Sequence, residues 1–217
     1  MMKNNFKRRV YTSLVLLAIV FLMFTSQIIL TYFLIVLGIL SILEFTKMIK
    51  KIILNKTLQL SINLIFIIYV YLFCFMFFFF SSFIQLKIIL LIFLIGCISS
   101  DIGGYAFGKT FKGPKITKIS PNKTYAGALG SIIFTIFIMS LLFFYIFKNF
   151  NYKIILVALV TSIFCQIGDL IFSFLKREAK TKDTGKLLPG HGGILDRIDG
   201  IYLGMPLGLY TFILLYH

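Results

Sequence analysis

Long uninterrupted apolar runs constrain the fold of this chain more than any other feature. The 34 residues between Arg9 and Glu44 carry no charge, and neither do the residues between Lys123 and Lys148. Charged residues make up 13% of the chain, whereas a soluble domain carries about 25%. A helix crosses the bilayer with about 20 apolar residues. The runs therefore predict an all-α polytopic membrane protein.

The charged residues between the apolar runs divide the chain into about seven predicted transmembrane helices. Residues 10–43 are long enough for two short helices, with a turn near residues 25–27. The basic N-terminus resembles a signal peptide, but no cleavage signal follows a short apolar core, so we expect an uncleaved first span. The remaining spans are expected between Lys56 and Lys87, between Lys87 and Asp101, between Lys123 and Lys148, at residues 154–175 and at residues 200–216.

The distribution of basic residues predicts the orientation of these spans. If the N-terminus lies in the cytosol, the cytosolic segments hold 19 of the 22 Lys and Arg residues, as the positive-inside rule requires. Those segments are the N-terminus, residues 47–56, residues 101–123 and residues 176–199. This distribution accounts for the net charge of +15 better than nucleic-acid binding does.

Two of the predicted cytosolic segments, residues 101–123 and 176–199, are long polar loops rich in Gly, Pro and Lys. The other connections are short and plain. Long polar loops in an otherwise minimal membrane protein usually carry its function. We therefore expect N-terminal transmembrane helices over residues 1–100 and a catalytic transmembrane region over residues 101–217.

Acidic residues are concentrated near the C-terminus, where five of the seven fall between Asp169 and Asp199. Asp169 lies inside the predicted sixth span, about 10 Å below its cytosolic end. Such a carboxylate needs a partner, and either a hydrogen bond to another span or a metal ion would supply it. Mg²⁺ prefers one or two carboxylates plus substrate phosphates. Asp169 and Asp196 are therefore candidate ligands.

Asp169 begins a polar stripe on one helix face, because Ser173, Lys176 and Arg177 follow it at i+4, i+7 and i+8. The stripe would lead from the membrane interior to the cytosol, although Lys176 and Arg177 could instead only anchor the helix end. His191 lies in a glycine-rich loop. We interpret it either as a ligand or acid–base group, or as a residue that orients the turn.

Residues 103–110 match the phosphate-loop pattern G-x-x-x-x-G-K-T. That pattern binds phosphate only between a buried strand and a helix, whereas here a predicted transmembrane span precedes it and Gly113-Pro114 follows it. We therefore reject a P-loop ATPase. The five lysines of residues 101–123 still offer cations to a polyanion, or attract the segment to anionic lipid.

The second polar loop carries a long motif. It reads Ser173, Lys176-Arg177, Lys182-Asp183, Pro189-Gly190-His191-Gly192-Gly193 and Asp196-Arg197-Ile198-Asp199. In these residues and spacings the chain resembles the phosphatidate cytidylyltransferases, also called CDP-diacylglycerol synthases. Gly168-Asp169 and the stretch from Ser120 to Thr124 also resemble the family, so the resemblance covers residues 100–200. The chain departs from many relatives at Ala126, where they carry Glu.

The resemblance implies that CTP and phosphatidic acid give CDP-diacylglycerol and pyrophosphate, with Mg²⁺ bound by Asp169 and Asp196. The implied catalytic residues are Asp169, Ser173, Lys176, Arg177, Lys182, Asp183, His191, Asp196, Arg197 and Asp199. Ser120, Lys123, Asp101, Gly192 and Gly193 are implied to bind substrate. Cations suit this reaction, because two polyanions must approach each other against their repulsion.

Two other functions remain as alternatives. A related CTP-dependent transferase or kinase could use another lipid acceptor, such as an ether lipid or a polyprenol. An ion or proton transporter could use Asp169, but it should carry acids on several spans, and only Asp169 is expected to lie deep. We expect an integral protein of the bacterial inner membrane with its active site facing the cytosol, acting in phospholipid biosynthesis, with a homodimer as the candidate assembly.

Overall fold

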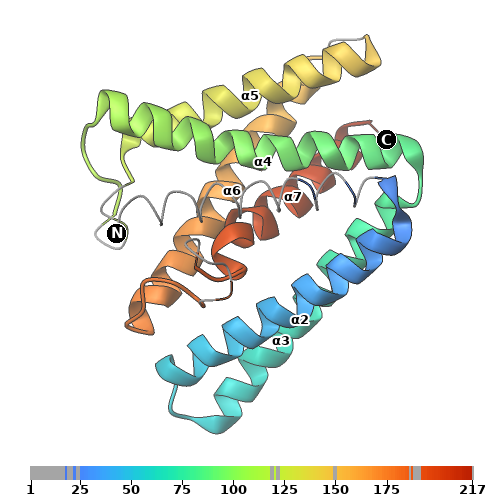
Figure 1. Ribbon diagram of the computed structural model, residues 1–217. Helices are drawn as coiled ribbons and strands as arrows, with labels where there is room; N and C mark the ends of the chain where they lie inside the picture. The colour runs from blue at the N-terminus through green and yellow to red at the C-terminus, as the bar shows by residue number, and fades with distance from the viewer. Residues whose placement is uncertain are drawn as a thin grey trace. The chain divides into compact units, whose positions relative to one another are not determined.

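The computed structural model describes residues 18, 22, 25–117, 120, 123–148, 151–185, 187 and 192–216. Within these residues it has six helices that are long and apolar enough to cross a membrane. They are α2 (Gln27–Ile52), α3 (Lys56–Ser81), α4 (Ile84–Phe111), α5 (Tyr125–Phe147), α6 (Lys153–Glu178) and α7 (Leu195–Tyr216) (Figure 1). The chain is an all-helical integral membrane protein, as predicted. Most of the first predicted span lies outside the described residues, so the count of seven stays a prediction.

Within the predicted turn near residues 25–27, the structure has a break in helical geometry at Ser26. Its backbone is extended, with φ −131° and ψ 123°, between helical Thr25 and the start of α2. However, α2 is not short, because it continues through Glu44 to Ile52. The connection to α3 is therefore only three residues long, and most of the predicted cytosolic segment 47–56 is helical.

Helix α4 differs most from the prediction. It runs for 28 residues through Lys87 and Asp101 to Phe111, so residues 101–111 of the predicted polar loop are helical. A charged side chain does not end a helix, because the backbone hydrogen bonds do not depend on it. Backbone geometry ends it instead, since Lys112 and Gly113 have φ of 51° and 108° and Pro114 follows.

Helices α5 and α6 match their predicted spans closely, whereas α7 begins five residues before residue 200. Lys148 ends α5 in the left-handed region, with φ 54°. Because α7 starts at Leu195, Asp196 and Asp199 both lie in its first turns.

The described helices divide into two compact units that interleave along the chain. The first unit is Met1–Lys87 with Leu175–Ile198, and the second is Ile88–Phe174 with Asp199–His217. The predicted division between residues 1–100 and 101–217 falls within α4, whereas the nearest boundary between the two compact units falls between Lys87 and Ile88.

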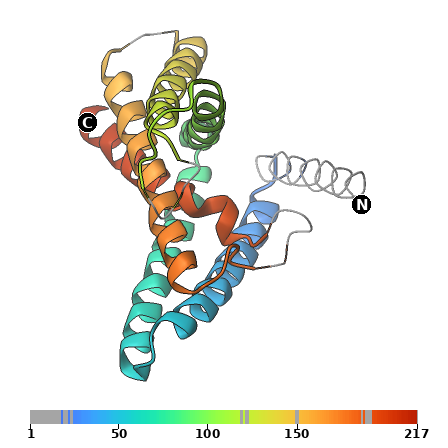
Figure 2. The same cartoon turned by 90° about the vertical axis from the view of Figure 1, so that its left-hand side faces the viewer.

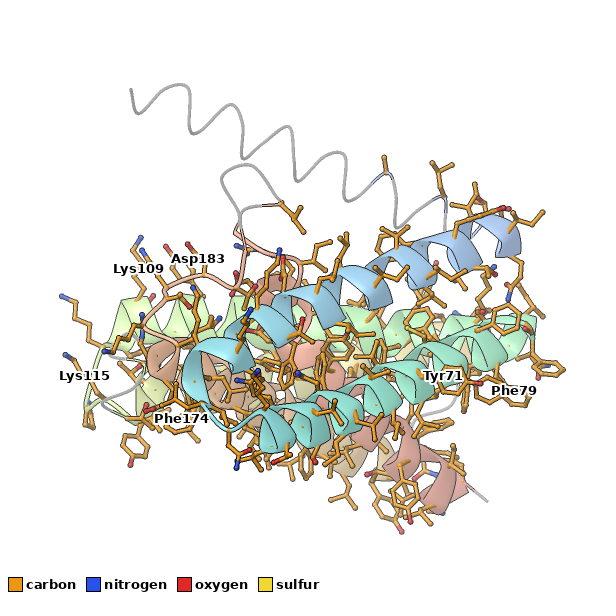
Figure 3. All side chains as sticks on the ribbon, turned by 90° about the horizontal axis from the view of Figure 1, so that it is seen from below. Tyr71, Phe79, Lys109, Lys115, Phe174 and Asp183 are labelled. Carbon is orange, nitrogen blue, oxygen red and sulfur yellow. The ribbon has the colours of Figure 1, made fainter. Side chains whose placement is uncertain are left out.

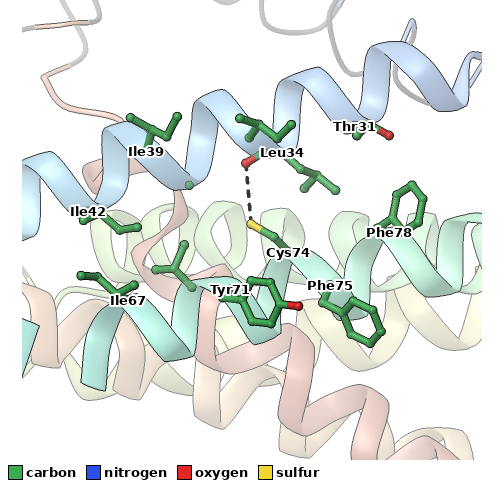
Figure 4. Close-up of a pocket in the computed structure, with 12 residues that line it drawn as sticks. Thr31, Leu34, Ile39, Ile42, Ile67, Tyr71, Cys74, Phe75 and Phe78 are labelled. Atoms are coloured by element: carbon green, nitrogen blue, oxygen red, sulfur yellow. Dashed lines mark hydrogen bonds between the residues drawn. The ribbon is translucent and has the colours of Figure 1, made fainter. Parts of the chain in front are cut away.

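In the first unit, α2 and α3 form an antiparallel hairpin (Figures 1 and 2). At one end, the Gln27 amide donates to the Ser81 hydroxyl at 3.0 Å. At the other, the rings of Phe45 and Phe66 stack with centroids 3.8 Å apart. Between them the helices leave an apolar groove, where the Cys74 thiol donates to the Leu34 carbonyl oxygen (Figure 4).

In the second unit, glycines bring α4 and α5 into close contact (Figure 1). A Cβ atom on Gly103 would lie 2.6 Å from the Gly130 carbonyl oxygen, and one on Gly127 would lie 2.8 Å from the Gly104 carbonyl oxygen. Small residues allow such backbone contact between membrane helices. The glycines of the phosphate-loop pattern thus serve helix packing, and the rejection of a P-loop is confirmed by their place on α4.

Helices α6 and α7 pack by the same means within the second unit. A Cβ atom on Gly168 would lie 2.6 Å from the Asp199 carbonyl oxygen, and one on Gly200 would lie 2.7 Å from the Cys165 sulfur. Helix α6 also contacts α4 in this unit, since the buried hydroxyls of Ser100 on α4 and Ser162 on α6 lie 3.1 Å apart. Asp169, next to Gly168, therefore follows a tightly packed part of α6.

We expect Gly103→Val to destabilise the protein, because the added side chain would meet a carbonyl oxygen that cannot rotate away. Overpacking of this kind costs about 1–3 kcal/mol. Thermal unfolding in detergent micelles measures the loss. Ala106→Val is the matched control, since Ala106 lies on the same helix with an exposed side chain. Equal melting temperatures for the two variants would contradict the packing role of Gly103.

Candidate functional site

The predicted site residues lie in both units, and those of the first unit cluster where α6 ends and α7 begins. Helix α6 ends with Lys180 in the left-handed region, at φ 53°. The amides of Lys180 and Thr181 donate to the carbonyl oxygens of Arg177 and Lys176, at 2.9 Å each. This pair of bonds is a Schellman motif. It turns the chain sharply after the Lys176-Arg177 pair.

Asp196 receives hydrogen bonds on both carboxylate oxygens. Its Oδ1 accepts from the Lys176 ammonium at 2.8 Å, with side chains that are 7% and 12% exposed. Its Oδ2 accepts from the backbone amides of Thr184 at 2.8 Å and Gly193 at 2.9 Å. Asp196 therefore joins the end of α6, the following loop and the start of α7.

Glu44 on α2 accepts hydrogen bonds from the same loop. It is 3% exposed. Its Oε2 accepts from the Thr184 hydroxyl at 2.8 Å and from the Leu195 amide at 2.9 Å, and its Oε1 accepts from the Ile194 amide at 3.1 Å. Leu195 is the first residue of α7, so Glu44 satisfies amides that a helix start leaves without intrahelical acceptors.

Glu44 is absent from the predicted site residues, because in the sequence it marks the end of an apolar run. The signal in the sequence is an acid with apolar neighbours on both sides, Leu43 and Phe45. Glu44 and Asp101 both lie inside apolar helices. Glu44 is buried in the protein, so the need for internal partners is not confined to Asp169. The depth of each acid in the membrane stays a prediction.

In the second unit, Lys123 and Asp169 form an ion pair at 2.5 Å, with side chains that are 23% and 33% exposed. The chain before α5 fixes Lys123, because the Ile116 amide donates to the Lys123 carbonyl oxygen at 3.0 Å. The next residue, Thr124, accepts from the Gly127 amide and caps α5. On the other side of the pair, the Ser173 hydroxyl donates to Asp169 at 3.3 Å.

The polar stripe predicted on α6 is present, since Asp169, Ser173, Lys176 and Arg177 all lie on that helix. Asp169 and Ser173 are in contact, as their spacing predicts. The described structure thus brings together two sets of predicted residues, Lys123 with Asp169 and Ser173, and Lys176 with Asp196 and Gly193.

The other predicted site residues are mostly exposed. Those with exposed side chains are Asp101, Arg177, Lys182, Asp183 and Arg197, whereas Ser120, Gly192 and Asp199 are half-buried. His191 lies outside the described residues. Gly192 has φ 88°, which favours glycine. Lys109 and Lys115 are exposed, and their side chains extend outward from the ribbon (Figure 3).

The acidic residues supply hard oxygen ligands of the kind that Mg²⁺ prefers. Within the described part of the chain, no group of three or more His, Cys, Asp and Glu side chains converges on one point. One or two carboxylates are enough for Mg²⁺, because substrate phosphates complete its coordination, so the donor types fit. Asp169 belongs to the second unit and Asp196 to the first. Their use of one common ion stays a sequence-based prediction.

Comparison with known proteins assigns these residues to a family. Residues 54–216 match the family described as the cytidylyltransferase family, and they include both ion pairs and the whole loop from α6 to α7. The chain belongs to the cytidylyltransferase family. Membership agrees with the resemblance drawn from the motif between Ser173 and Asp199.

Individual members of the cytidylyltransferase family show the same likeness. A protein named phosphatidate cytidylyltransferase from Staphylococcus haemolyticus (strain JCSC1435) is 41% identical over 124 residues, which is 56% of this chain and 47% of the relative. Proteins of that name from Staphylococcus aureus (strain COL) and Brucella suis biovar 1 (strain 1330) are 42% and 40% identical over the same length, with 47% and 46% of those proteins covered. The chain thus spans about half the length of the curated relatives it matches.

We expect Lys123→Met to destabilise the protein by about 1–3 kcal/mol, because it leaves the partly buried Asp169 carboxylate without its cation. Adding Asp169→Asn should recover part of that loss, since the uncompensated charge is then gone. Thermal unfolding of the two single variants and the double variant measures the coupling. Lys115→Met is the control for removing an exposed lysine nearby, and a loss as large as that of Lys123→Met would contradict a specific pair.

Proposed function

We propose that the chain transfers the cytidylyl group of CTP to phosphatidic acid, giving CDP-diacylglycerol and pyrophosphate in phospholipid biosynthesis. The observation that carries this proposal is the family match over residues 54–216. It includes the complete motif from Ser173 to Asp199, and the relatives matched are named for this reaction. On this proposal the chain is a nucleotidyltransferase.

The reaction explains why lysines lie beside carboxylates. A phosphate oxygen of phosphatidic acid attacks the α-phosphorus of CTP, a new P–O bond forms, and the bond to the β-phosphate breaks to release pyrophosphate. The attacking phosphate is already ionised, so the main barrier is repulsion between polyanions. Lys123 and Lys176, each fixed by an ion pair, would offer positive charge to the phosphates.

Magnesium fits the same groups. We propose that Asp169 and Asp196 hold Mg²⁺, which when bound neutralises phosphate charge and stabilises the leaving pyrophosphate. Lys182, Arg177 and Arg197 are exposed side chains of the motif and are further candidates for phosphate contacts. Ser173 donates to Asp169 and so orients that carboxylate.

The orientation in the membrane is part of the proposal. We infer seven spans with a cytosolic N-terminus in a bacterial inner membrane, with the active site at the cytosolic face. The bias of basic residues toward one set of connections supports this orientation. A homodimer stays a prediction.

Purified protein supplied with CTP, phosphatidic acid and Mg²⁺ should release pyrophosphate and form CDP-diacylglycerol. Asp169→Asn and Asp196→Asn should each lower turnover by about 100-fold or more while the protein still inserts, because each removes a carboxylate charge from the proposed metal site. Asp169→Asn is the cleaner variant, since Asp196 also holds the loop.

Lys109→Ala is the control, because Lys109 is exposed on α4 and lies over the Tyr105 ring. Its turnover should stay within about threefold of the wild type, as for other surface changes. Near-normal turnover in Asp169→Asn would refute the metal assignment. Product formation from CTP and a polyprenol, with none from phosphatidic acid, would instead assign the chain to another lipid acceptor.

A further inference from the structure

Glu44 is a buried carboxylate that lies on a helix far in sequence from the motif. It is 3% exposed and lies eight residues before the end of α2. Inserting a charged side chain at the centre of a membrane helix costs about 2.5–3.5 kcal/mol, and less toward its end. The side chain must therefore find donors within the protein, and the three that the described residues supply lie within residues 184–195.

These donors lie at both ends of one loop. The Thr184 hydroxyl donates from the beginning of the loop, and the Ile194 and Leu195 amides donate from its end. One carboxylate thus joins the two ends of a segment of about ten residues. Its hydrogen bonds offset part of the conformational entropy that this segment loses on folding. The loop contains Gly192 and Gly193 and begins next to Asp183, all of them motif residues.

Thr184 connects Glu44 to Asp196. Its hydroxyl donates to Glu44 at 2.8 Å, while its backbone amide donates to Asp196 at 2.8 Å. Asp196 in turn accepts from Lys176. A displacement of the Thr184 backbone would therefore move a donor of Asp196, although Glu44 and Asp196 need not touch each other.

We propose that Glu44 is a positioning residue for the cytidylyl transfer, and that it acts through Thr184 to set the place of Asp196 and of the loop before α7. This inference rests on the proposed function. Glu44 is 3% exposed and its donors belong to the loop, so it acts on the loop rather than on substrate. Misplacement of reacting groups by about 1 Å can cost 100-fold in rate, which gives such a residue a measurable kinetic effect.

The test compares four variants in the purified full chain. Glu44→Gln places an amide NH₂ group against backbone donors, and Thr184→Val removes the bridging hydroxyl but keeps the side-chain shape. Thr184→Ser keeps the hydroxyl and should restore the wild-type values. Ser41→Ala is the matched control, because Ser41 is buried on the same helix but donates only within it, to the Leu37 carbonyl oxygen.

We expect Glu44→Gln and Thr184→Val to lower kcat/KM for CTP by about 10- to 100-fold, with a raised KM for CTP. The KM for phosphatidic acid should stay within about twofold in both. A loss of folded protein would lower apparent kcat and leave both KM values unchanged. If Glu44→Gln fails to accumulate, the contrast between Thr184→Val and Thr184→Ser decides the matter. Wild-type KM and kcat in Thr184→Val would overturn the proposal.

A second readout does not depend on activity. Trypsin cleaves after lysine, and Lys182 lies exposed at the start of the loop. Cleavage there should be at least about fivefold faster in Glu44→Gln and Thr184→Val than in wild type, because the loop opens more often. If wild-type protein releases no pyrophosphate from CTP and phosphatidic acid, the proposed function has failed. Cleavage then decides alone whether Glu44 holds the loop, and equal rates would show that it does not.

Discussion

A carboxylate that leaves water must find donors or cations inside the protein, and three carboxylates of this chain do so in different ways. Glu44 accepts from a hydroxyl and two backbone amides, Asp169 pairs with Lys123, and Asp196 combines a lysine with two amides. Lys176 lies on α6, and the other donors lie in the segments that precede α5 and α7 or at the first residue of α7. The need to satisfy these acids therefore orders the irregular segments that carry the functional motif.

Glycine has a different role here from the one that its pattern suggests. Gly103 and Gly104 match part of a phosphate loop, yet they lie on α4 and allow its backbone to approach α5 closely. Gly193 does follow the expectation for a functional loop, since its amide donates to Asp196. Glycine thus allows close helix packing on α4, whereas in the loop before α7 it lets a backbone amide approach a carboxylate.

Apolar runs were sufficient to predict the helices, because in lipid a helix satisfies its own backbone groups. The break at Ser26 and the bounds of α5 and α6 followed from local signals. The length of α4 does not follow from such signals, because charged residues such as Asp101 are tolerated within helices. The partners of Glu44 lie 140 or more residues away along the chain, and nothing local to α2 indicates them. Asp169 was predicted to need a partner, but its pairing with Lys123 depends on tertiary packing.

If the Glu44 carboxylate holds the loop that precedes α7, hydrogen exchange should show it at the amides of Thr184, Ile194 and Leu195, because these amides donate to Asp196 and Glu44. We expect slow exchange in wild type and at least about tenfold faster exchange in Glu44→Gln, with the later turns of α7 unchanged. Equal exchange at these three amides in both proteins would contradict it.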